Sequence, residues 1–289
     1  MLNQVGAISL DEILRDRLPA WNRIPRILHA GALALVRRLT RIDDVEALVA
    51  SQAEKRGAAF IDGLFSDLDF SYVVSDADKA RIPVAGRVVI VANHPLGAMD
   101  ALALLRTVLG RRSDVRVVAN ELLMRVDGLA GHFLPFDMFA AHPRKSHVAA
   151  FGRALEREEA LVMFPSGEVS RLTASGVRDR TWLRGAAHLA YKHHAPVLPV
   201  FIGGRNSWVF YVLSFLSRTV TALLLPRQIL HQRGRAIRLT IGDLIPDTTF
   251  GRAEQVDALR AHVYAIGQQA AASVSSARNR AIRRRETSA

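Results

Sequence analysis

The chain has 289 residues, of which 49% are hydrophobic and 23% are charged, so it can form one α/β domain of about 200–250 residues with terminal additions. This composition excludes global disorder, collagen-like repeats and low-complexity sequence, and the absence of cysteine excludes disulfides, thiolate nucleophiles and cysteine-based zinc sites. The formal net charge of +12 indicates an anionic partner, which composition leaves open between nucleic acid, a phospholipid surface and a phosphorylated substrate.

The first eighty residues are predicted to be helical. In one candidate helix the apolar residues share a side and arginines flank them: Ile24, Ile27, Leu28, Leu35 and Val36, with Arg23, Arg26, Arg37 and Arg38. Such a basic amphipathic helix either rests on a membrane surface or packs onto the core of its own chain, and the sequence leaves both readings open. The first residues lack a basic segment followed by an apolar run, so we expect no signal peptide.

From about residue 43 onward, helical and strand-like segments alternate. Helices are predicted over 43–65, 98–109, 146–159, 182–194 and 253–272, and strands over 70–74, 87–92, 115–119, 160–164, 196–202 and 236–241. Continuous β-branched runs such as 87–92 are typical of strands that are buried on both faces. The pattern therefore predicts an α/β fold with a mostly parallel sheet flanked by helices, and with a helical N-terminal extension.

The expected organisation is a helical region over 1–80, one domain over 81–274 and a basic mobile tail over 275–289. From Arg205 to the end there are 13 arginines and 5 acidic residues, so most of the excess charge lies downstream. The most apolar stretch, 207–226, alternates aromatic and aliphatic residues and is interrupted by Arg218, so we expect no membrane-spanning helix. It predicts either core packing or a pair of interfacial helices.

His94 and Asp100 form the most informative local pattern. The strand over 87–92 delivers His94 to its carboxyl end, where open α/β sheets place their ligands, and Gly97 permits a sharp turn before Asp100 enters the next helix. A carboxylate that holds one imidazole nitrogen fixes the tautomer and makes the other nitrogen a better base. Two other readings remain open: Asp100 only favours a helix N-terminus, and His94 only closes a turn.

A second loop of interest follows the strand over 160–164. It holds Glu168, Ser170 and Arg171 within four positions, after a Pro/Gly turn. Such a loop offers backbone N–H groups and a guanidinium group to an anion. The alternative is an ordinary strand-to-helix connection.

Three ordered blocks in this chain resemble motifs of the glycerolipid acyltransferase superfamily. They are Asn93-His94 with Asp100, Phe164-Pro165-Ser-Gly167, and Ala195-Pro196-Val-Leu-Pro199-Val200. They resemble the first, third and fourth blocks of the superfamily, and Gly131–Asp137 is a fainter candidate for the second. The resemblance spans about Gly86 to Ile202 and implies the α/β fold of these enzymes, with 81–274 as the acyltransferase domain.

Two departures narrow the resemblance. Five residues separate His94 from Asp100 where the superfamily usually has four, and the acidic residue of the third block, Glu168, follows the glycine instead of preceding it. With the segments 206–211 and 225–228, these features resemble the branch that contains hemolysin-like proteins and lyso-ornithine-lipid O-acyltransferases. The resemblance therefore implies the reaction type more firmly than the substrate.

The resemblance implies roles for the motif residues. His94 would be the general base that deprotonates an acceptor hydroxyl, Asp100 would orient it, and the alkoxide would attack the thioester of acyl-CoA or of acyl-acyl carrier protein. Backbone N–H groups near Gly167 or near His94 are candidates to stabilise the oxyanion. The acceptor-binding residues would be Gly167, Glu168, Ser170 and Arg171, and Glu168 would meet an acceptor amine where other members meet a phosphate.

The expected function is O-acylation of a lysolipid, either lyso-ornithine lipid or lysophosphatidate, at the cytoplasmic face of the inner membrane. The expected partner is an anionic membrane surface, and no cofactor or metal is expected, because His193 and His194 are read as surface histidines. The alternative is a lipid-binding relative that has lost catalysis. Nucleic-acid binding is disfavoured, because the basic run over 273–289 contains no aromatic residue.

Overall fold

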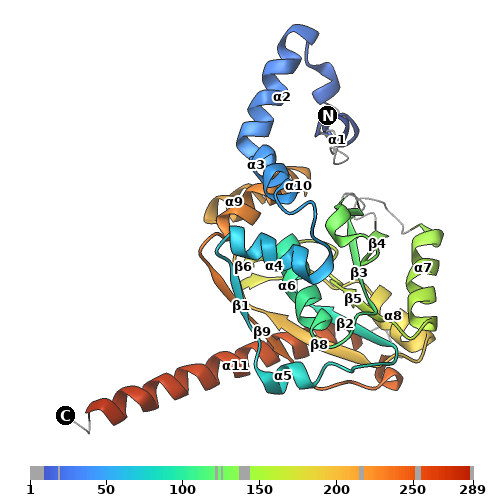
Figure 1. The fold of residues 1–289 in the computed structure, drawn as a ribbon, viewed down its shortest axis with the longest axis vertical. Helices are drawn as coiled ribbons and strands as arrows, with labels where there is room; N and C mark the ends of the chain where they lie inside the picture. Colours follow the sequence, from blue (N-terminus) through green and yellow to red (C-terminus); the bar gives the residue numbers. More distant parts are fainter. Residues whose placement is uncertain are drawn as a thin grey trace.

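A seven-stranded sheet runs through the body of the molecule in the order β1-β9-β8-β2-β5-β3-β4 (Figure 1). The computed structural model describes residues 10–18, 20–120, 123–124, 126–136, 144–214, 218–250 and 255–286. The strands are β1 Ser71–Val73, β2 Val88–Ala92, β3 Val115–Asn120, β4 Phe133–Phe136, β5 Ala160–Met163, β8 Val197–Ile202 and β9 Ala236–Ile241. All neighbouring pairs are parallel except β8 with β9, which confirms the predicted α/β fold with a mostly parallel sheet.

The central strand β2 is buried on both faces because each face is covered by helices. Val88, Ile90 and Ala92 pack into one core with α4 (Gly57–Asp67) and α6 (Ala98–Leu109). Val89 and Val91 pack into a second core with α7 (Lys145–Glu156), α8 (Gly185–Lys192) and α11 (Gln255–Glu286). The continuous β-branched run is thus explained by two hydrophobic layers.

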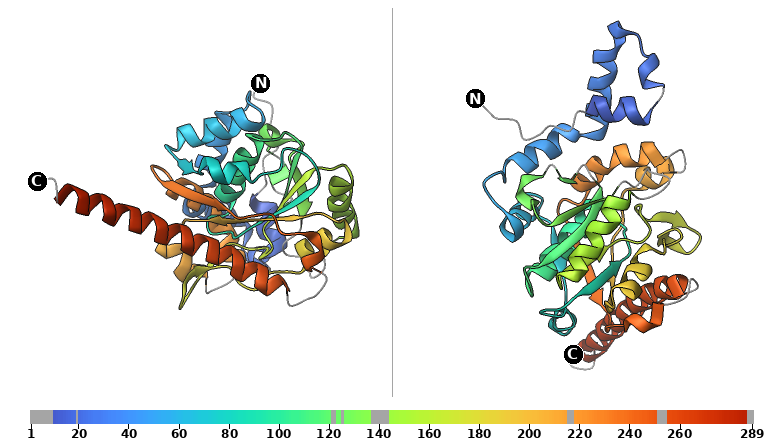
Figure 2. Two further views of the ribbon diagram at one scale, coloured as in Figure 1. Left: turned by 90° about the horizontal axis from the view of Figure 1, so that it is seen from below. Right: turned by 90° about the vertical axis from the view of Figure 1, so that its right-hand side faces the viewer.

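The N-terminal helices project beyond the sheet, and α2 and α3 contact α10 (Arg218–His231) of the body (Figures 1 and 2). They are α1 (Leu10–Arg17), the 3-10 helix η1 (Trp21–Arg23), α2 (Arg26–Thr40) and α3 (Ile42–Ala50). We call α1, η1 and α2 the N-terminal arm. Leu10, Leu14 and Trp21 form a small cluster of their own, whereas Ile27 on α2 is 89% exposed. Packing of this amphipathic helix onto the core is therefore only partial.

The helix expected over 43–65 is wrong in one respect, because two helices, α3 and α4, occupy this region. A turn separates them, and Gly57 begins α4 with φ +54°, a conformation that few other residues adopt. The side chains of Ser51 and Gln52 donate to Asp67 at the end of α4, at 2.9 and 2.7 Å. These bonds fold α3 back toward α4, which local periodicity did not reveal.

The aromatic and aliphatic stretch forms two helices, α9 (Trp208–Ser214) and α10 (Arg218–His231). Phe210 and Tyr211 are buried in a cluster with Val169, while Trp208 and Val212 are each 63% exposed. Core packing therefore holds for one side of this stretch, whereas the interfacial reading of the exposed side stays a prediction. Of the helices described, none is long and apolar enough to cross a membrane.

Several shorter elements complete the chain. They are α5 (Asp76–Ala80), the 3-10 helices η3 (Asp127–Leu129) and η4 (Asp247–Phe250), and the hairpin of β6 (Arg171–Thr173) and β7 (Gly176–Arg178). The hairpin and β4 were not predicted. The helix expected over 182–194 begins only at Gly185, because Trp182 lies in the loop after β7.

The last helix differs most from its expected bounds. Helix α11 continues to Glu286 instead of ending near residue 272, so most of the expected tail is helical, and whether it is mobile stays a prediction. Its first part packs on β8 and β9, and the rest projects from the end of the molecule opposite α2 (Figures 1 and 2). The end of α11 therefore lies away from α9.

Candidate active site

His94 and Asp100 meet at the carboxyl end of β2. The His94 Nδ1 atom lies 3.2 Å from Asp100 Oδ2, and the His94 side chain is 18% exposed while that of Asp100 is fully buried. The imidazole ring stacks on Phe164 with 4.1 Å between ring centroids. A partly accessible imidazole thus sits between a buried carboxylate and an aromatic face, so Nε2 is the nitrogen that can exchange a proton with a substrate.

Asp100 serves the turn and the histidine at once. Its Oδ2 atom accepts backbone N–H bonds from Leu96 at 2.7 Å and from Gly97 at 3.1 Å. Complete burial raises the pKa of the Asp100 carboxyl, against the lowering by His94 and by these two N–H groups. Both sequence readings of Asp100, as a helix N-terminal group and as a partner of His94, therefore hold in the same geometry.

Gly97 makes the turn possible despite the extra residue in the first block. Its φ is +84°, and an added Cβ would lie 3.3 Å from Val169 and 3.4 Å from Leu225. Helix α6 begins directly afterwards at Ala98. The glycine thus brings Asp100 back under His94 across five intervening residues.

Asn93 and the fourth block hold β8 beside β2 and β9. The Asn93 side chain donates to the Ile202 carbonyl at 2.8 Å and accepts from the Ile202 N–H at 2.7 Å, which ties the ends of β2 and β8 together. The Pro196 carbonyl accepts the N–H of Val89. The Pro199 carbonyl accepts the N–H of Gly242, which is the first residue after β9. Proline is tolerated at 199 because β9 has already ended opposite it.

The third-block loop closes over the other side of His94. Pro165 accepts the N–H of Leu183, and Gly167, at φ +63°, donates to the Phe164 carbonyl at 3.0 Å. Glu168 follows in this turn, and its side chain is only 11% exposed. The loop is therefore a tight, internally bonded turn.

Glu168 lies between two arginines. Its Oε2 atom is 2.9 Å from Arg171 Nη2, and its Oε1 atom is 3.7 Å from Arg180 Nε. The Arg171 side chain is 7% exposed, whereas that of Arg180 is 55% exposed. The contact of Glu168 with Arg171 is thus buried, whereas its contact with Arg180 faces solvent.

The four residues predicted to bind the acceptor divide into two pairs. Gly167 and Glu168 are partly exposed, but Ser170 and Arg171 are buried. The Ser170 hydroxyl donates to Asp179 at 2.5 Å, and Arg171 donates to the Ser214 carbonyl at 3.2 Å and the Thr221 hydroxyl at 2.8 Å. In this conformation Ser170 and Arg171 support the loop from beneath, and Arg171 ties it to α9 and α10.

Most backbone N–H groups suggested for the oxyanion are already bonded within the site. His94 N–H donates to Asp179, those of Leu96 and Gly97 donate to Asp100, and that of Gly167 donates to Phe164. Within the described part of the two loops, the N–H groups of Ser166 and Val169 have no hydrogen-bond acceptor. If an oxyanion forms beside His94, these are two loop donors available to meet it.

Sequence reasoning missed a buried polar layer beneath the site. Asp179 is 1% exposed and accepts bonds from His94, Ser170 and Trp182. A second group of buried polar side chains lies in segments that the resemblance had marked, and it joins the loop after β8 to α9 and α10. The Asn206 side chain donates to the Pro95 carbonyl, the Tyr211 hydroxyl accepts the Asn206 N–H, and the Gln228 side chain accepts the Ser207 N–H. Asp179 had no signal, because its partners come from distant positions.

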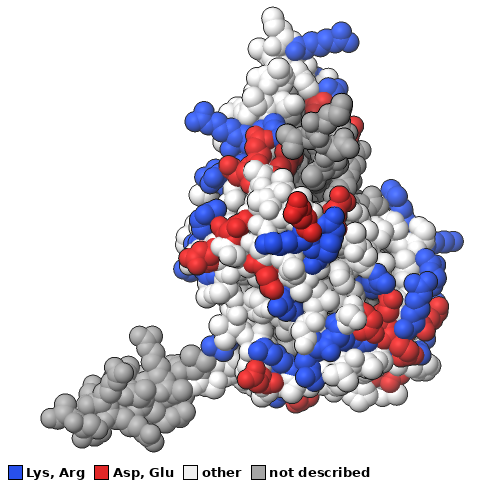
Figure 3. Space-filling model, viewed as in Figure 1, with Lys and Arg blue, Asp and Glu red and all other residues white. Residues whose placement is uncertain are grey.

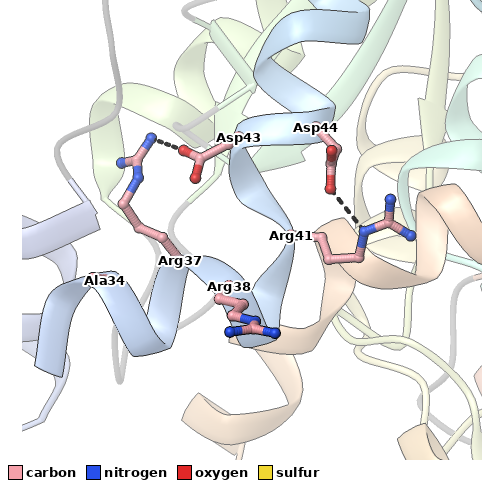
Figure 4. Close-up of a pocket in the computed structure, with 6 residues that line it drawn as sticks. All are labelled: Ala34, Arg37, Arg38, Arg41, Asp43 and Asp44. Carbon is pink, nitrogen blue, oxygen red and sulfur yellow. Dashed lines mark hydrogen bonds and ion pairs between the residues drawn. The ribbon is translucent and has the colours of Figure 1, made fainter. Parts of the chain in front are cut away.

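The candidate second block lies on the edge strand β4, paired with β3. Its last residue, Asp137, is outside the described residues. Another hollow, at the junction of α2 and α3, is separate from the strand ends; it is lined by Ala34, Arg37, Arg38, Arg41, Asp43 and Asp44 (Figure 4). There Arg37 pairs with Asp43 and Arg41 with Asp44, so the hollow is partly neutralised and has no histidine or nucleophile to perform chemistry.

Comparison with known proteins gives consistent similarities. A sequence profile of a family described as acyltransferases matches residues 13–272. A lyso-glycine lipid O-acyltransferase of Bacteroides thetaiotaomicron is 27% identical over 256 residues, which cover 86% of this chain and 91% of that protein. One of the same name from Phocaeicola vulgatus is 27% identical over 262 residues, which cover 86% and 90%. The solved structure of the 1-acyl-sn-glycerophosphate (LPA) acyltransferase PlsC from Thermotoga maritima aligns with a TM-score of 0.47 at 18% identity, over 92% of this chain and 98% of that one.

Proposed function

The chain belongs to the acyltransferase family, and from this premise we propose that it transfers a fatty acyl group from a thioester to the hydroxyl of a lysolipid. The family match confirms the resemblance seen in the motif blocks and the class of enzyme. Two relatives named as lyso-glycine lipid O-acyltransferases support a lysolipid acceptor. The observation that carries the proposal is the buried Asp100 carboxylate held against the part-exposed His94 imidazole.

In the proposed step, His94 Nε2 takes the proton of the acceptor hydroxyl while Asp100 faces Nδ1. The acceptor oxygen attacks the thioester carbonyl, and the new C–O bond forms as the carbonyl oxygen becomes negative. When the carbonyl re-forms, the C–S bond breaks and the thiolate takes the proton from His94. The Asp100 carboxylate stabilises the imidazolium that exists in between. No covalent enzyme intermediate and no cofactor takes part in this scheme.

We propose that the donor is acyl-CoA or acyl-acyl carrier protein and that the acceptor has an amino-acid head group, such as lyso-ornithine lipid, with lysophosphatidate as the competing acceptor. The Glu168–Arg180 contact supports this choice, because an ion pair at 3.7 Å with one side chain 55% exposed contributes little stability. An acceptor ammonium group can displace Arg180 from Glu168. The released Arg180 can then pair with the acceptor carboxylate.

The variant Glu168→Gln tests the head-group proposal. It keeps the shape of the side chain and removes its charge, so it should lower kcat/KM for lyso-ornithine lipid by about 10-fold, the worth of one charge-assisted hydrogen bond, and affect lysophosphatidate much less. An equal loss on both acceptors would show that Glu168 only supports the loop through Arg171.

We further propose that the enzyme works at an anionic membrane surface, on the cytoplasmic face of the inner membrane. Support comes from exposed apolar residues on α2 and α9, two helices that both contact α10 (Figure 1): Ile27, Leu28, Leu35, Leu39, Trp208, Val209 and Val212. Arg38 lies beside them on α2, exposed and without an ion pair among the described residues (Figure 4). On the face drawn in Figure 3 basic and acidic side chains are interspersed over the body. The exposed apolar residues of α2 and α9 are therefore a better candidate for membrane contact than this mixed-charge surface.

The reaction itself is tested by thiol release. Purified protein in detergent is given acyl-CoA or acyl-acyl carrier protein together with each lysolipid, and both the free thiol and the diacylated product are measured. The proposal requires thiol release that depends on the acceptor and matches the product formed. Thiol release without an acylated lipid, or none with any donor and acceptor pair, would contradict it.

A further inference from the structure

A buried carboxylate that the proposed mechanism does not use lies beneath both motif loops. Asp179 follows β7, far along the chain from the first block, and is 1% exposed. Its Oδ1 atom accepts the backbone N–H of His94 at 3.1 Å and the hydroxyl of Ser170 at 2.5 Å. Its Oδ2 atom accepts the indole N–H of Trp182 at 2.8 Å. Three donors from three separate segments thus converge on one side chain.

Only neutral hydrogen-bond donors satisfy the buried Asp179 carboxylate among the described residues. Burial of a carboxylate costs several kcal/mol unless its oxygens are filled, and all three donors here are neutral. In the described part of the chain, no side chain of lysine, arginine or histidine lies within ion-pair distance of the Asp179 carboxylate. Burial, and after it the negative charge of Asp179, raise the pKa of Tyr264, whose hydroxyl accepts the Asp179 N–H at 2.7 Å. An apolar residue here would leave all three donors without an acceptor, so the carboxylate is what joins the segments that carry them.

The group that Asp179 holds is the backbone of His94. The His94 N–H donates to Asp179, and the His94 carbonyl accepts the N–H of Ser170 at 2.8 Å. Ser170 in turn donates its hydroxyl to Asp179. The main chain of His94 is therefore fixed to the third-block loop, whereas Asp100 on α6 faces its imidazole ring.

We propose that Asp179 is a positioning residue for His94, which locks the first and third motif blocks together and sets the place of the imidazole over Phe164. The inference rests on the proposed role of His94 as the general base. Asp179 acts through the backbone of His94 and touches neither its ring nor the substrate. Because Asp179 occupies the His94 N–H, it also leaves oxyanion stabilisation to other donors, such as the N–H groups of Ser166 and Val169.

Helix α11 contacts the backbone of Asp179 through Arg260 and Tyr264. The Asp179 carbonyl accepts a bond from Arg260, and the Tyr264 ring lies under the Arg178 guanidinium at 4.7 Å. Both Arg260 and Tyr264 belong to the part of α11 that packs on the sheet. Asp179 therefore contacts α11 through its backbone and the His94 segment through its carboxylate.

The test is a double-mutant cycle built on the hydrogen-bond directions. In Asp179→Asn the side chain has one acceptor oxygen and one amide donor, so in either orientation the amide faces a donor, either the indole N–H of Trp182 or the His94 N–H. Trp182→Phe removes the indole N–H. In the double variant the amide oxygen can accept from His94 and Ser170 while the amide nitrogen faces no donor.

We expect Asp179→Asn to lower kcat by about 10- to 100-fold with KM for the lysolipid changed little, as for a misplaced catalytic group. The double variant should regain about tenfold of that loss. The His94 imidazole resonances in NMR spectra should shift in Asp179→Asn and return toward the wild-type positions in the double variant. Arg112→Met, at the opposite edge of the sheet, is the matched control: it lowers the thermal stability but should leave kcat and the His94 resonances unchanged.

The outcomes separate the two proposals. If Asp179→Asn folds and keeps wild-type kcat, or if its loss follows the loss of folded protein as measured by circular dichroism, the positioning role is wrong. The same holds if Trp182→Phe gives no rescue and the His94 resonances stay in place. If His94→Ala keeps wild-type activity, the proposed function fails instead, while the resonance shift still reports whether Asp179 positions His94.

Discussion

Replacement of Asp100 by asparagine isolates the charge in the His94 pair. The carboxylate accepts two backbone N–H bonds and faces His94 through the same atom, Oδ2, while Oδ1 has no hydrogen-bond partner. An asparagine can place its oxygen at the Oδ2 position and keep these contacts, with its amide nitrogen where Oδ1 stood. The substitution thus removes the negative charge and leaves the geometry nearly intact.

The size of the effect follows from the distance. Unit charges 3.2 Å apart interact by about 5 kcal/mol at an effective dielectric constant of about 20, which is an upper limit for the stabilisation of imidazolium in the reaction. Each 1.36 kcal/mol is about tenfold in rate, so kcat of Asp100→Asn should fall by about 10³- to 10⁴-fold. The fold should survive, because a neutral side chain no longer bears the desolvation that raises the pKa of Asp100.

The assay is thiol release at saturating acyl donor with varied lysolipid, so that kcat and KM are separated. Asp62→Asn is the matched control. Asp62 lies on α4 and forms a surface ion pair with Arg106, which is on the same helix, α6, as Asp100. We expect that control to stay within about twofold of wild type, as for an exposed ion pair. Wild-type kcat in Asp100→Asn, or a loss confined to KM, would refute the charge-stabilisation reasoning.

Two further predictions concern stability and membrane contact. Arg112 contacts both carboxylate oxygens of Asp114 at 2.7 Å and lowers the pKa of Asp114, so this pair stabilises the fold above the usual carboxyl pKa of about 3.9 and ceases to do so as pH falls through the lowered value. In denaturant unfolding, Asp114→Asn should be less stable than wild type at pH 7 and converge with it as the pH falls below the usual carboxyl pKa; a difference that does not change with pH would contradict the pairing. Anionic vesicles should carry wild-type protein in flotation at low salt, with about tenfold less bound for Val212→Asp, because a charge replaces an exposed apolar contact on α9. Binding that responds neither to salt nor to this substitution would remove α9 from the membrane surface.

The first-block pair could be predicted from sequence because its geometry is local. A buried strand, a glycine turn and a helix start lie within thirteen residues, so strand direction alone brings His94 and Asp100 to one edge. The third block was harder. Its residue types indicated polar contacts, but not that Ser170 and Arg171 direct theirs inward to Asp179, Ser214 and Thr221.

The missed features depend on long-range packing. Asp179 and His94 are 85 positions apart, and no periodicity or motif spacing connects them. The direction of α11 was equally out of reach, because a basic helical segment can continue straight into solvent or fold back. Charge clustering showed only that the excess charge lies late in the chain, whereas the fold directs the end of α11 away from α2.

The central claim is that His94 is the base for acyl transfer to a lysolipid hydroxyl. The direct measurement is formation of diacylated product from a labelled acyl thioester and a lysolipid, with wild type and His94→Ala compared at equal folded concentration. We predict that His94→Ala loses at least about 10³-fold in kcat, since it removes both the general base and the partner of Asp100. Equal product formation by the two proteins would contradict the account.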